Sequence, residues 1–237
     1  MEDYKKVGIN RLSIGLQSIN NDILKEIGRI HTYKDFLETY QMARKVGFEN
    51  INVDLMLALP KQTCKDLQKS LEEVIKLSPE HISIYSLILE EGTKLQKLVE
   101  QGSITLPEDE IERNMYWMVK KILEKNGYIH YEISNFAKAG YESKHNLNCW
   151  NQKQYLGFGL SAHSYYNKTR YSNVTNIKQY INVGAGLVSA RDSKIIHEIQ
   201  SKQDEQKEYM MLGLRKIEGV SIADFKNKFV RESNLYI

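Results

Sequence analysis

The stretch Asn50–Pro60 reads NINVDLMLALP, an aliphatic run with one carboxylate, Asp54, in its middle. Apolar side chains fall at every second position, and the intervening positions are mostly polar: Ile51, Val53, Leu55 and Leu57 alternate with Asn52, Asp54 and Met56. This alternation is typical of a β-strand that buries one face. The sequence therefore predicts a strand whose second face carries Asp54.

Two further segments show the same alternation, residues 11–18 (RLSIGLQS) and 81–89 (HISIYSLIL). Helical patterns separate the three strands, with a short helix after residue 18 and longer ones over 31–48 and 63–78. The longer ones each begin with Thr-x-x-Asp, which is typical of a capping box. Strands separated by helices pair in parallel, because the returning chain needs a crossover.

The polar second face decides the type of α/β fold. Central strands of a flat, doubly wound sheet are apolar on both sides, because helices cover both faces. Curling the sheet into a barrel instead turns the polar face toward a ligand or water. In such barrels the chemistry lies at the carboxyl ends of the strands, where Gln17, Asp54 and Tyr85 fall. The residues alone leave a second reading open, in which Asp54 forms a structural ion pair with Arg11 or Arg29.

The rest of the chain suggests two more regions. After residue 90 we expect a short helix, a loop and a long helix between Pro107 and Gly127, followed by short strands and loops rich in Tyr, Asn, Gly and His. From Gln200 onward the pattern predicts two helices joined at Gly219. The predicted organisation is 1–90 for half a barrel, 91–198 for an α+β region, and 199–237 for the start of a helical domain.

Composition excludes several classes of protein. No apolar run in the 237 residues reaches the length of a membrane span, which places the chain in the cytoplasm. The formal net charge of +3 is too small, and the lysines near the C-terminus too scattered, for a nucleic-acid-binding surface. Cys64 and Cys149 are too few and too far apart for a disulfide framework or a cysteine metal cluster.

Several motifs, in order and spacing, resemble the radical S-adenosylmethionine (SAM) proteins of the coproporphyrinogen dehydrogenase superfamily, and within it the heme chaperone branch. They are GINRLSIGLQSIN (8–20), LKEIGRIHT (24–32), FENINVDLMLALPKQT (48–63), PEHISIYSLILEEGT (79–93), YEISNFAKAGYESKHN (131–146) and LGFGLSAHS (156–164). The resemblance covers nearly the whole chain. It implies a partial TIM-like (β/α) barrel that carries SAM and a [4Fe–4S] cluster bound by a CxxxCxxC loop, with C-terminal helices that resemble a winged-helix domain.

The chain departs from this family at the cluster loop, which is absent together with the first barrel strands. Two cysteines cannot supply the three thiolates that hold such a cluster. We therefore expect this chain to be a fragment that lacks the N-terminal barrel half and is inactive in radical chemistry by itself. The alternative is a natural short paralogue, which would leave strand 11–18 as an unpaired edge.

The resemblance also implies which residues bind SAM. Gln17, Arg29 and Asp54 match family positions that contact SAM, and Tyr85 at the end of the third strand is expected to line the cavity or pack on the adenine. Carboxylates and amides bind hydroxyl and ammonium groups, and a guanidinium pairs with a carboxylate. The alternative for Arg29 is a structural role at the end of the helix at Gly28.

A second motif concerns heme. The heme chaperone branch carries HNxxYW, and this chain reads HNLNCW over residues 145–150, which we expect to form a loop. His145 is the candidate ligand of the heme iron, with Tyr141, Trp150 and Tyr155 covering the porphyrin. Cys149 stands where tyrosine is usual and is a weaker alternative ligand. A hydrogen-bonding role for the histidine and burial of the cysteine as a small apolar residue are the structural alternatives.

The resemblance implies a heme-binding chaperone that delivers heme to an acceptor protein and reaches membranes peripherally through that acceptor. The alternative is the oxygen-independent coproporphyrinogen III oxidase, a radical SAM enzyme of porphyrin biosynthesis. His163 is a weaker second candidate for heme, whereas His31, His81, His130 and His197 are expected to be structural.

Overall fold

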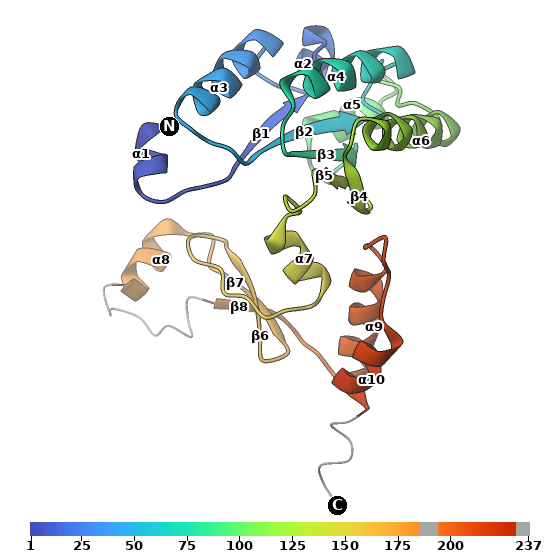
Figure 1. Cartoon of the computed structure of the whole chain (residues 1–237). Helices are drawn as coiled ribbons and strands as arrows, with labels where there is room; N and C mark the ends of the chain where they lie inside the picture. The colour runs from blue at the N-terminus through green and yellow to red at the C-terminus, as the bar shows by residue number, and fades with distance from the viewer. Residues whose placement is uncertain (185–193, 231–237) are drawn as a thin grey trace, which may run out of the picture. The chain divides into compact units, whose positions relative to one another are not determined.

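A computed structural model of the chain describes residues 1–184 and 194–230. It divides into two compact units, Met1–Glu142 and Ser143–Ile237 (Figure 1). The three predicted regions with boundaries near 90 and 198 remain predictions, and the last of them ends outside the described residues. No helix in the described ranges is both long enough and apolar enough to cross a membrane.

The first unit is built on a five-stranded sheet in the order β1-β2-β3-β5-β4. The first three strands, β1 (Leu12–Gln17), β2 (Ile51–Leu57) and β3 (His81–Ser86), pair in parallel as predicted. The antiparallel strands β5 (Asn135–Ala137) and β4 (Ile129–Glu132) extend the sheet beyond β3. The third strand is shorter than the predicted 81–89, because its neighbour β2 ends at Leu57. The amide of Leu87 still donates a hydrogen bond to the carbonyl of Leu57, just after β3 ends at Ser86.

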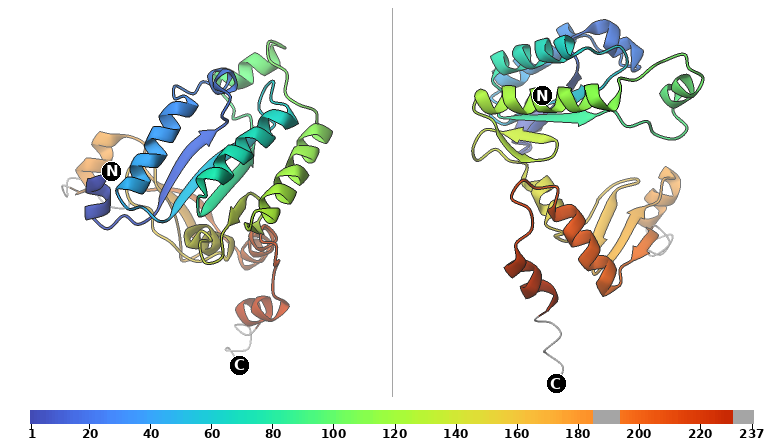
Figure 2. Two further views of the ribbon diagram at one scale, coloured as in Figure 1. Left: turned by 45° about the horizontal axis from the view of Figure 1, so that its top comes forward. Right: turned by 90° about the vertical axis from the view of Figure 1, so that its right-hand side faces the viewer.

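Helices cover one face of this sheet (Figures 1 and 2). The three long ones, α3 (Tyr33–Lys45), α4 (Cys64–Leu77) and α6 (Asp109–Lys125), pack against the sheet and supply much of the core. The short helices are α1 (Glu2–Lys6), α2 (Asn21–Glu26) and α5 (Lys94–Glu100). The aliphatic positions of β2 are fully buried: Ile51, Val53, Leu55 and Leu57. The predicted face of α3 is buried too, through Phe36, Tyr40 and Ala43.

Both predicted capping boxes form. In α4 the Thr63 hydroxyl accepts a hydrogen bond from the amide of Asp66 at 3.2 Å, and the Asp66 carboxylate accepts one from the amide of Thr63 at 3.0 Å. The box at Thr32 and Asp35 opens α3 in the same way. The cap at Thr63 fixes where α4 begins after β2, and so fixes the length of the loop at the carboxyl end of that strand.

The cap of α4 gives a test of its contribution to stability. Thr63→Ala should lower the free energy of unfolding of the first unit by about 1 kcal/mol, because one amide of the first turn loses its acceptor. Urea unfolding followed by the fluorescence of Trp117, in a Trp150→Phe background, measures this unit alone. Thr63→Ser keeps the acceptor and should cost much less. Equal losses for the two variants would show that the hydroxyl is not the stabilising group.

The second unit begins with α7 (Lys144–Trp150) and contains an antiparallel sheet of β6 (His163–Tyr166), β7 (Thr169–Asn173) and β8 (Lys194–Ile199). Its other helices are α8 (Ile177–Gly184), α9 (Lys202–Gly213) and α10 (Ile222–Phe229), and Gly219 lies between the last two as predicted. A salt bridge of 2.6 Å between Arg170 of β7 and Glu208 of α9 joins sheet to helix.

The prediction of a loop over HNLNCW was wrong. These residues form all but the first residue of α7, whose N-terminus is capped by the side chain of Ser143. Ser143 accepts a hydrogen bond from the amide of Asn146, so a Ser-x-x-Asn cap starts the helix despite the low helix propensity of the asparagines. The helix places the first and fifth residues of the motif one turn apart on the same side.

Candidate functional site

Polar side chains on the face of the first sheet form one hydrogen-bonded network centred on Asn52 of β2. The Asn52 amide nitrogen donates to the Asp54 carboxylate at 2.7 Å, and Ser13 donates to the same carboxylate at 3.3 Å. The Asn52 amide oxygen accepts from Ser83 at 3.0 Å and contacts Nδ1 of His81 at 2.6 Å. The network therefore holds Asp54 in place through two neighbouring strands.

His81 is held in one protonation state by this network. Its Nδ1 faces the Asn52 amide oxygen and therefore carries the proton, while Nε2 lies 2.7 Å from the Tyr131 hydroxyl and accepts from it. Burial, and secondarily the positive charge of Arg11, lower the pKa of His81 to about 3. With 1% of its surface exposed, the imidazole is neutral and structural, as the sequence suggested.

Gln17 ends β1 in an unusual backbone conformation, with its side chain against Gly15. Its φ is +63°, and its amide folds back over Gly15, where a Cβ atom would lie 2.7 Å from the Gln17 amide nitrogen. When the amide is turned over so that nitrogen takes the place of oxygen, the nitrogen reaches the carbonyls of Gly15 at 3.2 Å and Leu16 at 3.3 Å. Gly15 is the register partner of Asp54, and after a shift in register Gln17 pairs with Leu55, the residue that follows Asp54.

The other two predicted SAM residues, Tyr85 and Arg29, lie in different parts of the first unit. Tyr85 is 40% exposed and pairs with Met56, two positions beyond the pairing of Asp54 with Ser83, so it shares the face of Asp54. Arg29 follows α2 on the surface, and its backbone amide bonds to the carbonyl of Leu24 at 2.8 Å. The Asp54 carboxylate accepts hydrogen bonds from Ser13 and Asn52, and its proposed pairing with Arg11 or Arg29 stays a prediction.

The second unit brings the two candidate heme ligands together on α7. Nε2 of His145 lies 3.9 Å from Sγ of Cys149, one helical turn away. The Tyr155 ring stands edge-on to the imidazole, with 6.4 Å between ring centroids. Burial raises the pKa of the Cys149 thiol, and the nearby charge of Arg170 opposes this only in part. The pair therefore consists of an imidazole and a protonated thiol near neutral pH.

The predicted aromatic neighbours of His145 have separate roles. The Trp150 ring carries the guanidinium of Arg215, 4.3 Å from its centroid, so this face of the indole is already covered. Tyr141 belongs to the first unit. The second-choice histidine, His163, stacks on His197 of β8 with 5.2 Å between centroids. Of the three predicted aromatics, Tyr155 is the one that contacts His145.

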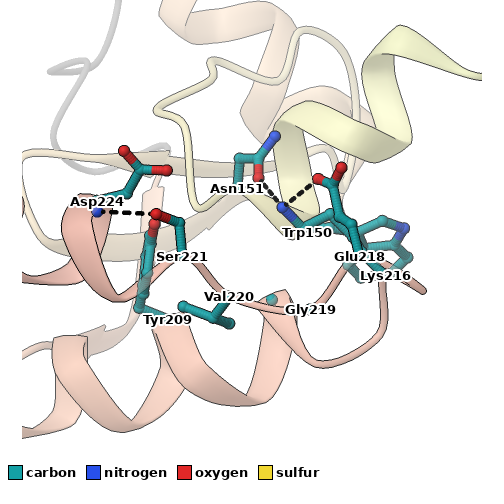
Figure 3. A pocket seen from close by; sticks show the side chains of 10 residues that line it. Trp150, Asn151, Tyr209, Lys216, Glu218, Gly219, Val220, Ser221 and Asp224 are labelled. Atoms are coloured by element: carbon teal, nitrogen blue, oxygen red, sulfur yellow. Dashed lines mark hydrogen bonds and ion pairs between the residues drawn. The ribbon is translucent and has the colours of Figure 1, made fainter.

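A polar pocket of about 290 Å³ lies where the end of α7 meets the turn between α9 and α10 (Figure 3). Within it Lys216 donates to Asn151 at 2.6 Å and to Glu218 at 3.0 Å. Ser221 caps α10 by accepting from the amide of Asp224 at 3.2 Å. Lys216 and Glu218 thus pair with each other, and the described residues that line this pocket include neither His145 nor Cys149.

Of the two cofactors that the family implies, a [4Fe–4S] cluster and SAM, SAM is the better fit to the residues of this chain. Cys64 is the first residue of α4 in the first unit, and Cys149 lies in the second. Over residues 1–184 and 194–230, no group of three or more His, Cys, Asp or Glu side chains is placed to hold a metal. A [4Fe–4S] cluster therefore does not fit the residues of this chain. SAM fits better, because the half-buried Asp54 presents a fixed carboxylate on the face of the sheet that it shares with the exposed Tyr85.

Comparisons with known proteins agree with this architecture. Residues 1–74 match the Radical SAM superfamily. The chain is 46% identical over 228 residues to the heme chaperone HemW of Bacillus subtilis (strain 168), a match that covers 96% of this chain and 59% of that protein. The heme chaperone HemW of Lactococcus lactis subsp. lactis (strain IL1403) is 39% identical over 221 residues, covering 93% and 57%. The chain thus spans less than two thirds of the length of these relatives.

Among solved structures, the chain is similar to coproporphyrinogen III oxidase (HemN) from Escherichia coli, described as a radical SAM enzyme. The TM-score is 0.75 at 21% identity, over 97% of this chain and 55% of that one. These findings place the chain in the class of proteins with a radical SAM fold. Within this class its sequence is similar, over nearly its whole length, to the heme chaperones HemW.

Proposed function

We propose that this chain binds heme through α7 and forms part of a protein that passes heme to an acceptor. The observation that carries the proposal is the convergence of His145 and Cys149 at 3.9 Å on one side of α7. The relatives named heme chaperone support it, because the match extends across α7. The acceptor, and any membrane contact made through it, belong to this proposal.

His145 is the proposed ligand of the heme iron. A neutral imidazole binds iron directly, whereas a thiol must first lose its proton. Because burial raises the pKa of Cys149, its thiol is the weaker competitor near neutral pH. Tyr155 stands edge-on to the imidazole and is placed to restrict its rotation. The chain thus supplies one oriented axial ligand.

We infer that the polar face of the first sheet is the part that recognises SAM. When bound, SAM brings a sulfonium cation together with ribose hydroxyls and an amino-acid group. Asp54 is proposed to accept hydrogen bonds from hydroxyl or ammonium groups, with Gln17 as a further hydrogen-bonding contact and Tyr85 packing on the adenine. Arg29 is the fourth proposed contact, and as a guanidinium it would bind the carboxylate of SAM.

Coproporphyrinogen III oxidation is the less favoured function. The similarity to HemN, at 21% identity, concerns the fold alone. The two cysteines of this chain lie in different units and do not form the three-thiolate site that a radical SAM reaction needs. Heme binding through α7, by contrast, requires residues that the chain contains.

A hemin titration followed by the Soret band tests the proposal. His145→Ala should weaken hemin binding about tenfold or more, since the loss of about 1.4 kcal/mol of binding free energy already has that effect. Cys149→Ala should leave the affinity within about twofold of the parent, because the thiol is protonated near neutral pH.

Cys64→Ala is the matched control, since this cysteine lies in the first unit. It should leave both the affinity and the position of the Soret band unchanged. Equal hemin binding by the parent and His145→Ala would overturn the assignment of His145. A weak signal that does not saturate in any of the four proteins would overturn heme binding by this chain.

A further inference from the structure

His145 and Cys149 lie on the same side of α7, and heme iron cannot bind both side chains in this arrangement. Heme iron accepts one axial ligand from each side of the porphyrin plane, so two ligands from one side of one helix cannot both bind it. A bare metal ion has no such plane and can take two ligands from the same side. The second ligand on α7 is therefore left unused by the proposed function.

The distance between the two ligand atoms suits a tetrahedral ion. Zn²⁺ lies about 2.3 Å from a thiolate sulfur and about 2.05 Å from an imidazole nitrogen, so a tetrahedral angle places the two atoms about 3.6 Å apart. Nε2 of His145 and Sγ of Cys149 are 3.9 Å apart. A small rotation of either side chain closes the difference, without any change in the backbone of α7.

The two atoms already face each other. The sulfur–nitrogen contact at 3.9 Å is within the range of a weak hydrogen bond that involves sulfur, so the two ligand atoms are directed at the same space. This is the position that a bridging metal ion would take. Helical geometry fixes the spacing, because side chains one turn apart project from the same side of a helix.

We propose that His145 and Cys149 chelate a thiophilic divalent cation of the Zn²⁺ class. Binding forms one metal–nitrogen and one metal–sulfur bond, displaces water molecules from the hydrated ion, and releases the Cys149 thiol proton to solvent. No electron is transferred in this step. Since no third His, Cys, Asp or Glu joins the pair among the described residues, water or an external ligand completes the tetrahedron.

A cation bound at this site would reduce heme binding; this consequence rests on the proposed function. The same Nε2 atom would be needed by the heme iron, so the divalent cation and heme compete for His145. Cys149 increases the affinity for the divalent cation but makes no bond to the heme iron. A Zn²⁺-class ion is thereby an inhibitor of heme binding that acts through Cys149.

Titration with Co²⁺ tests the chelate without any heme. The whole chain, reduced and free of thiol buffers, should develop a saturable thiolate-to-Co²⁺ charge-transfer band at one ion per chain, together with intense visible bands of tetrahedral Co²⁺. Cys149→Ser should abolish the charge-transfer band. His145→Asn should weaken Co²⁺ binding at least tenfold.

Cys64→Ser is the matched control and should leave the titration unchanged, since Cys64 lies in the other unit. A band that disappears with Cys64→Ser, or that His145→Asn leaves intact, would overturn the proposal. The absence of any charge-transfer band on the parent chain would overturn it as well.

A second arm separates this inference from the proposed function. Zn²⁺ added before hemin should reduce hemin affinity at least tenfold for the parent and have little effect on Cys149→Ser. A Co²⁺ chelate without any hemin binding would support the cation site and reject heme handling. Hemin binding that Zn²⁺ does not reduce would reject the competition, whereas the chelate is judged by the Co²⁺ titration alone.

Discussion

Asn52→Leu is expected to lower the free energy of unfolding of the first unit by about 3 kcal/mol, because buried partners lose their hydrogen bonds. Asn52 donates to Asp54 and accepts from Ser83 and His81, and its side chain is 3% exposed. Leucine has a similar volume, so the loss reports unpaired polar groups rather than a cavity. The network at Asp54 thus depends on one amide.

Urea unfolding read from Trp117, in the Trp150→Phe background, measures this loss. Ser13→Ala is the comparison, because it removes a bond of 3.3 Å to the same carboxylate from an exposed position. It should cost less than about 1 kcal/mol. Similar losses for the two variants would mean that Asn52 is not the centre of the network.

Lowering the pH from 7 to 5 is expected to destabilise the first unit by about 2 kcal/mol through His81 alone. The pKa of His81 in the folded state is about 3, below its ordinary value of 6.5. The unfolded chain therefore binds a proton as the pH falls through about 6.5, whereas the folded chain does not. The stability contributed by the neutral imidazole is complete above that range and is lost as the pH falls.

His81→Gln separates this effect from the other titrations. Glutamine keeps a hydrogen-bonding side chain but takes up no proton, so the variant should be less stable at pH 7 and should lose about 2 kcal/mol less between pH 7 and 5. Some pH dependence will persist, because burial also lowers the pKa of His130. An unchanged pH dependence in His81→Gln would contradict the assignment.

Local signals in the sequence were sufficient for the parallel half of the first unit. The period-two alternation of 50–60 identified both the buried face of β2 and the polar face that carries Asp54. The Thr-x-x-Asp boxes gave the starts of α3 and α4. These features depend on neighbours within a few residues, so the sequence displays them directly.

Pairing between residues far apart in the sequence was harder to predict. Strands β4 and β5 are four and three residues long; β5 pairs with β3 and β4 with β5, and such short patterns could not indicate these partners. The central role of Asn52 was also missed, although it lies on the same alternating face as Asp54. Its partner His81 comes from another strand, which only the register shows.

The candidate ligands on α7 illustrate the same limit. The motif pointed to His145 and Cys149, but a predicted loop gave no reason for the two to meet. The helix that Ser143 starts is what places them one turn apart. Ser143, three residues before Asn146, is the residue that could have indicated the start of this helix. The asparagines favoured a loop instead, because asparagine has a low helix propensity.

The fold of Gln17 over Gly15 constrains how this strand end can vary. A methyl group on residue 15 would meet the Gln17 amide at 2.7 Å, so any larger residue there requires a different side chain or rotamer at position 17. A shorter side chain at position 17 would in turn release the need for glycine at position 15. Substitution of Gly15 is therefore expected to move the Gln17 amide into another rotamer, while the backbone of β1 stays in place.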